Sequence, residues 1–140
     1  MELEIFTLCD FAKSQGGKLI LFGPFDAIFT DKEPYIHRTC SLAMRIRFTR
    51  TEEGQHPFKL NILDQDGNRV FEELAGNIKV KLRVGMLSAA TDISIDIHNL
   101  KFPKFGEYSV RLTLDGREEK PLPIQILRST QPEDADKASD

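Results

Sequence analysis

The sequence predicts an all-β protein: an antiparallel two-sheet β-sandwich, immunoglobulin-like, with about eight or nine strands. Apolar and polar residues alternate along five segments, turn-forming residues separate those segments, and no long helical pattern interrupts them. Successive side chains of a strand point to opposite faces of the sheet. The alternation is therefore typical of antiparallel strands that each have one buried and one solvated face.

The first quarter departs from this alternation. Residues 3–9 and 18–22 carry apolar side chains at both parities, which is typical of strands covered on both faces. Between them, Asp10 followed by residues 11–15 and Gly16-Gly17 predicts one capped helical turn, because Asp10 can accept hydrogen bonds from free backbone N–H groups and a glycine can end the turn.

The next segment, residues 24–36, is apolar but irregular. It predicts a short strand over residues 25–30, followed by a packed loop. We expect this segment to cover the second face of the two N-terminal strands.

The alternating segments predict the remaining strands, which cover residues 40–49, 58–64, 77–84, 93–98 and 106–114. Asp66-Gly67-Asn68 and Asp115-Gly116 predict hairpin turns, because Asp-Gly favours positive φ. Pro121 and Pro123 flank the last apolar stretch, over residues 122–126. Proline cannot donate to a strand ladder, so this stretch is expected at a sheet edge or to enter its sheet late.

A Gly-x-Tyr sequence, Gly106-Glu107-Tyr108, enters one of the late strands. It resembles the tyrosine corner of immunoglobulin-like domains, in which the hydroxyl bonds to upstream backbone. This favours a sandwich over a barrel. The chain contains no tryptophan, so the core tryptophan of antibody domains is absent.

The charge of the chain is concentrated at its C-terminal end. Residues 129–140 hold four of the 22 acidic residues and one of the 19 basic residues, so residues 1–128 are neutral. We expect one β-sandwich domain over residues 1–128 and a disordered acidic tail over residues 129–140. No apolar run approaches the roughly 20 residues of a membrane helix, and no secretory signal is evident. These features predict a cytoplasmic protein without a membrane partner.

Two blocks of sequence are distinctive. The first is Phe6-Thr7-Leu8-Cys9-Asp10-x-Ala12, followed by Gly23-x-Phe25-Asp26-x-Ile28, and the second is Leu100-Lys101-Phe102-Pro103-x-Phe105-Gly106-Glu107-Tyr108. With these blocks the chain resembles an uncharacterised bacterial family, a domain of unknown function, over residues 3 to about 127. The resemblance implies a bacterial cytoplasmic origin and an all-β sandwich. It implies no activity, cofactor or catalytic residue.

Catalytic and metal-binding motifs are absent from the sequence. Cys9 and Cys40 are expected to be free, buried and inert thiols. His37, His56 and His98 lack metal-ligand spacing. We therefore expect no enzyme and no cofactor, and a small hydrolase with loop-borne Asp and His residues has no motif behind it.

The segment Asp64-Gln65-Asp66-Gly67-Asn68 begins like a calcium loop. A full calcium loop needs glycine at its sixth position and an acidic residue at its twelfth. Those positions are Arg69 and Ala75, so a hairpin turn is favoured. A calcium-dependent module remains an alternative only if other loop acids converge on this turn.

Two surfaces could bind a partner. The N-terminal strands and the segment after them carry more apolar residues than one core face needs, and the candidate interaction surface consists of Phe6, Leu8, Ile20, Phe22, Phe25, Ile28 and Phe29. The leading hypothesis is a non-enzymatic interaction module that binds a protein partner or a second copy of itself through this surface or a strand edge.

The alternative is a basic face that binds nucleic acid or another polyanion. It would form if two predicted strands shared a sheet, and its residues are Arg45, Arg47, Lys79, Lys81 and Arg83. A neutral body and the absence of an aromatic residue at those parities disfavour nucleic-acid binding.

Overall fold

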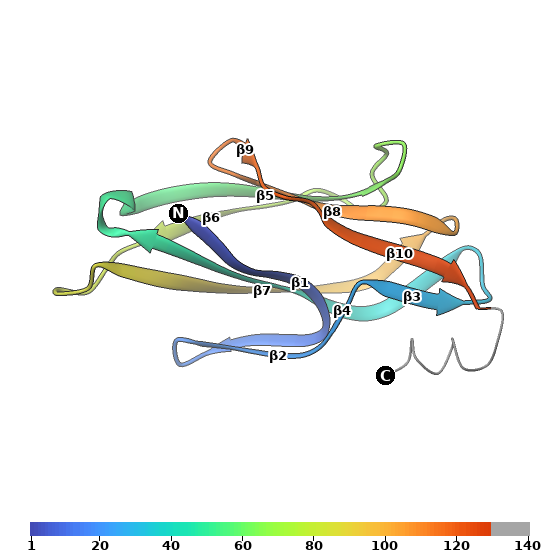
Figure 1. Ribbon diagram of the computed structural model, residues 1–140, viewed down its shortest axis with the longest axis horizontal. Helices are drawn as coiled ribbons and strands as arrows, with labels where there is room; N and C mark the ends of the chain where they lie inside the picture. Colours follow the sequence, from blue (N-terminus) through green and yellow to red (C-terminus); the bar gives the residue numbers. More distant parts are fainter. Residues whose placement is uncertain (130–140) are drawn as a thin grey trace.

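Two β-sheets enclose one main hydrophobic core (Figure 1). The structure, a computed structural model, describes residues 1–129, and that range contains ten strands and one short 3₁₀ turn, Arg50–Glu52. The strands are β1 (Glu2–Gln15), β2 (Lys18–Phe25), β3 (Ala27–Thr30), β4 (Tyr35–Thr49), β5 (Gly54–Asp64), β6 (Leu74–Val80), β7 (Ser88–Phe102), β8 (Gly106–Leu114), β9 (Arg117–Glu118) and β10 (Leu122–Arg128). The all-β prediction is confirmed, with ten strands in place of eight or nine.

The first sheet has the strand order β2-β1-β4-β7, and the second has the order β3-β10-β8-β5-β6, with the short β9 paired to β8. All these pairs are antiparallel except one. β3 pairs with β10 in parallel, from Ala27 opposite Gln125 to Thr30 opposite Arg128. The expectation of a wholly antiparallel fold is therefore wrong at this edge, where the chain crosses from the first sheet to the second between β2 and β3.

The main core lies between the sheets and draws on both. Leu42, Met44 and Phe48 from β4 are fully buried, as are Leu112 and Leu114 from β8. Their even numbering along each strand is the alternation seen in the sequence, because every second side chain points inward.

β1 is one continuous strand, so the predicted helical turn over residues 10–15 is wrong. Phe11 pairs with Phe22, and Ala12 pairs with Leu21. Gly16 and Gly17 both have positive φ, +61° and +74°, and form the two-residue turn of a β-hairpin. The glycines that were expected to end a helix instead reverse the strand, and cross-strand pairing outweighs the local capping potential of Asp10.

The β1–β2 hairpin supplies its own cover. In Figure 1 the hairpin bends away from the N-terminal half of β1 and runs back beneath β4 and β7. A second small cluster packs there, built from Cys9, Ala12 and Ala43 with Leu19 and Leu21. Ala43 lies on the outer face of β4 and is fully buried. Residues 24–36 do not provide this cover, because β3 joins the second sheet.

Several strand boundaries also differ from the prediction. β6 ends at Val80, so residues 81–84 lie outside the strand that was predicted over 77–84. β4 begins at Tyr35, within the segment predicted as a loop. Within β10, Pro123 pairs with Ser109 of β8, while β3 pairs only from Gln125 onward. β10 thus has a strand on both sides from Gln125 onward, but at Pro123 only β8 is paired with it. Pro123 therefore lies at a local sheet edge, where its missing N–H is tolerated.

The tail predicted over residues 129–140 lies, apart from Ser129, outside the described residues. The backbone N–H of Ser129 still donates to the carbonyl of Thr30, so Ser129 continues the pairing of β10 with β3.

Candidate functional site

An exposed apolar face on the β1–β2 hairpin is the first candidate. Phe11, Ile20 and Phe22 are 47%, 40% and 62% exposed. Phe11 and Phe22 are directly paired across the hairpin, and their ring centroids lie 6.0 Å apart. On the opposite face of the hairpin, Leu19 and Leu21 pack against the small cluster that includes Ala43 of β4. Phe11, Ile20 and Phe22, here called the hairpin patch, therefore point away from the rest of the molecule.

The hairpin also presents a free strand edge. Among the strands of residues 1–129, β2 is the last of its sheet and pairs only with β1. A two-residue turn makes Gln15 and Lys18 a hydrogen-bonded pair, and hydrogen bonding alternates along an antiparallel ladder. The backbone groups of Leu19 and Leu21 consequently face outward from the sheet, where they can bond another strand.

Most of the predicted interaction surface is in the core. Leu8 and Ile28 are 0% and 5% exposed, and Phe6 and Phe25 are partly buried against the main core. Phe29 is also partly buried, on β3. Of the seven predicted residues, only Ile20 and Phe22 reach the hairpin patch. Phe11 was missed because it fell within the predicted helical turn.

The predicted basic face does not form, because its two strands belong to different sheets. Arg45 and Arg47 lie on β4 of the first sheet, and Lys79 lies on β6 of the second, followed by Lys81 and Arg83 beyond the end of β6. The premise that these strands share a sheet is wrong.

The two arginines are also neutralised. Glu4 bridges them, with its carboxylate 3.1 Å from Nε of Arg45 and 2.7 Å from Nε of Arg47. Arg45 further donates to Asp92 at 2.8 Å. The hydrogen bond from Arg47 lowers the pKa of Glu4 despite some desolvation. Acidic side chains therefore pair with both arginines, as expected for a solvated sheet face that does not bind a polyanion.

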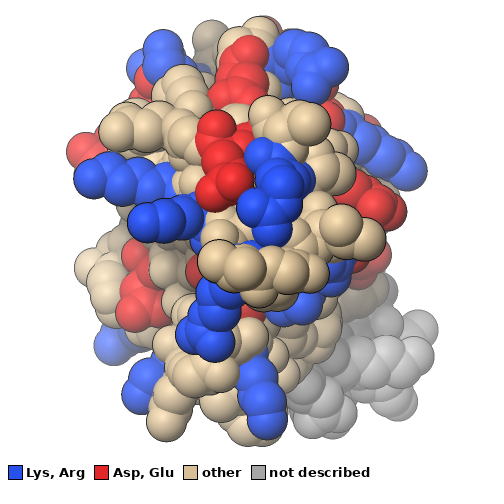
Figure 2. All heavy atoms as spheres, turned by 90° about the vertical axis from the view of Figure 1, so that its left-hand side faces the viewer, with Lys and Arg blue, Asp and Glu red and all other residues tan. Residues whose placement is uncertain are grey.

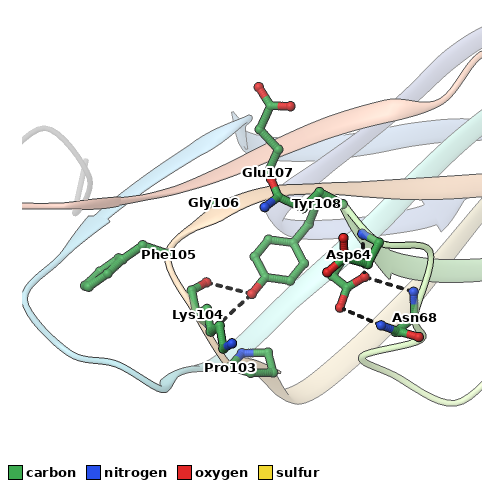
Figure 3. Close-up of a pocket in the computed structure, with 10 residues that line it drawn as sticks. Asp64, Asn68, Pro103, Lys104, Phe105, Gly106, Glu107 and Tyr108 are labelled. Carbon is green, nitrogen blue, oxygen red and sulfur yellow. Dashed lines mark hydrogen bonds between the residues drawn. The ribbon is translucent and has the colours of Figure 1, made fainter.

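A groove lies between the turn after β5 and the start of β8 (Figure 3). It has a volume of about 220 Å³, and a neighbouring cavity of about 570 Å³ shares part of its lining. Asp64, Asp66 and Glu107 line both cavities, with Lys104 in the first and Arg111 in the second. The groove is thus polar and of mixed charge.

The Asp64–Asn68 segment at this groove is a hairpin turn, as favoured above. One oxygen of Asp64 accepts from the backbone N–H groups of Asp66 and Asn68, both at 2.9 Å. These bonds, led by the one from Asn68, lower the pKa of Asp64. Within residues 1–129, no three His, Cys, Asp or Glu side chains gather in a way that could hold a metal ion.

The other wall of the groove contains the tyrosine corner. The hydroxyl of Tyr108 donates to the carbonyl of Lys104 at 2.6 Å and accepts from its N–H at 3.1 Å (Figure 3). The N–H of Phe105 donates to Glu33 at 2.8 Å, and Arg128 lies 4.7 Å above the Phe105 ring. The Phe-Pro-x-Phe-Gly-Glu-Tyr block thus shapes this corner.

Two of the histidines have structural partners. His56 contacts Asp115 through Nδ1 and the carbonyl of Glu52 through Nε2, both at 2.6 Å. These bonds tie the 3₁₀ turn to the turn after β8. His37 shares a hydrogen bond with the hydroxyl of Tyr35 at 2.8 Å, and burial lowers the pKa of His37.

Both cysteines are free and fully buried, as predicted. Burial raises the pKa of Cys9 and raises that of Cys40 to about 12, which leaves both thiols poor nucleophiles at neutral pH. The thiol of Cys9 contacts the carbonyls of Phe11 and Ser41 at 3.3 and 3.5 Å, so its polar contacts are to backbone groups.

The fold and its surfaces define the class: an all-β domain of two sheets around a shared core, with an exposed hairpin and a polar groove. The chain belongs to the family of unknown function DUF6941, whose family model matches residues 4–127. The resemblance to an uncharacterised domain family is thereby confirmed. A search of the curated proteins found no match. Among residues 1–129, no helix has the length and apolar character to cross a membrane.

Proposed function

We propose that the chain is a non-enzymatic interaction module of the immunoglobulin-like sandwich type, working in the bacterial cytoplasm, that associates with a second copy of itself through the β1–β2 hairpin. The observation that carries the proposal is the hairpin patch, in which Phe11, Ile20 and Phe22 are exposed beside a free strand edge. Aromatic side chains dominate the energetics of protein interfaces, since each buries a large area.

A second copy fits this edge by symmetry. If the two β2 strands pair antiparallel about Ile20, Leu19 of one copy lies opposite Leu21 of the other. These are the residues whose backbone groups face outward, so each copy both donates and accepts. Such an isologous contact uses the same patch on both subunits. It also places Ile20 against its own copy and Lys18 of one copy opposite Phe22 of the other, where its ammonium can lie over the ring.

Sedimentation velocity over the micromolar range tests the proposal. The wild-type chain is expected to show a concentration-dependent shift from monomer to dimer, and Ile20→Ser combined with Phe22→Ser is expected to abolish that shift. Ile36→Ser is the matched control, because Ile36 is 51% exposed on β4, outside the hairpin patch. A wild-type chain that stays monomeric, or a hairpin variant that still dimerises, contradicts the proposal.

A further inference from the structure

The connection between β6 and β7, residues 81–87, holds apolar side chains in water. Val84 is 101% exposed, Leu87 85% and Met86 39%. The loop projects beyond the sheets at the left-hand end of Figure 1. No described residue covers Val84, although exposing an aliphatic side chain forfeits the free energy of its burial.

The loop is ordered by hydrogen bonds. The N–H of Met86 donates to the carbonyl of Arg83 at 3.1 Å, and Gly85 has φ +90°, as at the third position of a type II turn. The Arg50 guanidinium donates to the same Arg83 carbonyl at 3.3 Å and to that of Met86 at 2.6 Å. The turn therefore presents Val84 at its corner in a fixed conformation.

The base of the loop is anchored in the domain. Leu82 is 6% exposed and belongs to the main core, and its N–H donates to Glu53 at 3.1 Å. This anchor fixes the direction in which the tip projects, with its aliphatic side chains outward.

Cations flank the exposed tip. Lys79, Lys81 and Arg83 are exposed, and none of the three takes part in an ion pair within residues 1–129. The acidic neighbour Glu53 is already engaged by Leu82 and lies 3.8 Å from Arg50. Figure 2 faces this end of the molecule and shows Lys and Arg side chains around an uncharged projecting surface, with acidic side chains interspersed.

We propose that residues 79–87 dock on an anionic lipid bilayer. Val84 and Leu87 enter the boundary between headgroups and acyl chains, while Lys79, Lys81 and Arg83 remain at the level of the lipid phosphates. An aliphatic tip flanked by cations is complementary to an anionic membrane surface, which offers apolar chains beneath negative charge. Such surface docking needs no membrane-spanning segment, but it departs from the sequence-based expectation of no membrane partner.

The aliphatic character of the tip separates this occupant from a nucleic acid. Single-stranded nucleic acids are bound by aromatic side chains on which bases stack, and residues 79–87 contain none. The loop is also a different surface from the hairpin patch, so lipid docking stands or falls independently of self-association.

Co-sedimentation of the full chain with vesicles tests the proposal. We expect partition onto vesicles of equal parts phosphatidylglycerol and phosphatidylcholine, and little onto phosphatidylcholine alone. Each cation near an anionic surface is worth roughly a fivefold change in partition, so Lys81→Gln with Arg83→Gln is expected to lower the partition coefficient about 25-fold. Val84→Ser with Leu87→Ser is expected to lower it at least about tenfold.

The matched control is Lys101→Gln with Lys104→Gln, which removes two exposed lysines near the opposite end of β7. This variant is expected to bind vesicles nearly as the wild type does, and a loss equal to that of the loop variant would reduce the effect to net charge and overturn the proposal. Equal binding to both vesicle types also overturns it. The proposal is also overturned if the loop variants bind vesicles as the wild type does but no longer form a dimer in sedimentation velocity. That result would mean that a second copy of the chain covers the loop.

Discussion

At the scale of single residues, the hydroxyl of Tyr108 ties the start of β8 to the connection that precedes it. It bonds both the N–H and the carbonyl of Lys104, and the side chain is 5% exposed. Tyr108→Phe leaves both backbone groups without this partner, and we expect it to lower the free energy of unfolding by about 1–2 kcal/mol. Urea denaturation measures the change.

Tyr35→Phe is the control for Tyr108→Phe, since the hydroxyl of Tyr35 makes one hydrogen bond, to His37. A loss of stability no larger than that of the control would show that the corner bonds contribute little.

His56 gives the stability a defined pH dependence. Burial alone would lower its pKa, but the Glu52 carbonyl and the Asp115 carboxylate outweigh burial, and the pKa of His56 is raised above 6.5. A raised pKa in the folded state stabilises the fold below the unfolded-state pKa, and this stabilisation is lost as pH rises through the folded-state value. We therefore expect the stability difference between wild type and His56→Gln to shrink between about pH 6 and pH 8. Urea titrations at several pH values measure it.

His37 should behave in the opposite way. Burial lowers its pKa, with Asp10 opposing the shift, so its stabilising contribution is present above the unfolded-state pKa and is lost as pH falls through the folded-state value. A His37→Gln variant therefore separates the two effects. If both variants change the pH profile in the same direction, the assignment of the pKa shifts is wrong.

At the scale of elements, the close approach of β1 and β2 near Asp10 requires a glycine at position 23. Its φ is +64°, and a Cβ there would overlap the carboxylate of Asp10. Gly23→Ala is expected to destabilise the protein by about 2 kcal/mol or more, from backbone strain and steric overlap together. Urea denaturation again provides the measurement.

Gly17→Ala is the matched control for Gly23→Ala. Gly17 has φ +74° with nothing within 4 Å of the added Cβ, so Gly17→Ala introduces backbone strain without steric overlap. Adding Asp10→Ser to Gly23→Ala should recover the steric part. Equal losses for the two glycine variants would exclude any contribution from the overlap.

The elements that the sequence predicts well are those whose burial is one-sided. β8 alternates strictly and has the predicted bounds, whereas β5 ends at Asp64 as predicted but begins at Gly54, four residues before the predicted start. The β1–β2 hairpin was harder to predict, because its residues pack in two different places. Leu8 packs in the main core, whereas Ala12 packs against the outer face of β4. Apolar residues at both parities indicated two-sided cover but not its source. The cover comes from the hairpin itself, which bends so that Leu19 and Leu21 pack against Ala43 of β4 (Figure 1).

At the scale of the whole molecule, the two thiols report on separate parts of the fold. Cys40 belongs to the main core, whereas Cys9 belongs to the small cluster beneath the hairpin. Because both are fully buried with raised pKa values, alkylation at neutral pH requires opening of the structure. We expect Cys9 to react at lower urea concentration than Cys40, since few side chains hold the hairpin in place.

Mass spectrometry of iodoacetamide-treated samples over a urea series measures this order. The single-cysteine variants Cys9→Ala and Cys40→Ala assign each rate. Coincident urea profiles would mean that the hairpin opens only when the whole domain unfolds.

Predicting the candidate surfaces required knowing which strands share a sheet, and the alternation of apolar and polar residues does not contain that information. Arg45 and Lys79 both lie at solvent-facing positions of their strands, yet β4 and β6 belong to different sheets. The order of strands in a sheet is decided by pairing between residues far apart in the sequence. The pairing of β3 with β10 is an example. Two of the three residues of the hairpin patch were predicted. Ile20 and Phe22 came from excess apolarity, while Phe11 required knowledge that β1 continues past Asp10. The loop tip at Val84 was hidden because its apolar residues continue the alternation of β6.

The parallel pairing of β3 with β10 constrains synthesis of the protein. β3 has four residues, and its one strand neighbour within residues 1–129 is β10, where Ala27 lies opposite Gln125, 98 residues further along the chain. As the chain leaves the ribosome, the β1–β2 hairpin can form early from local contacts, but β3 must wait until translation has reached Arg128. The second sheet can then be completed only after the last strand has been made.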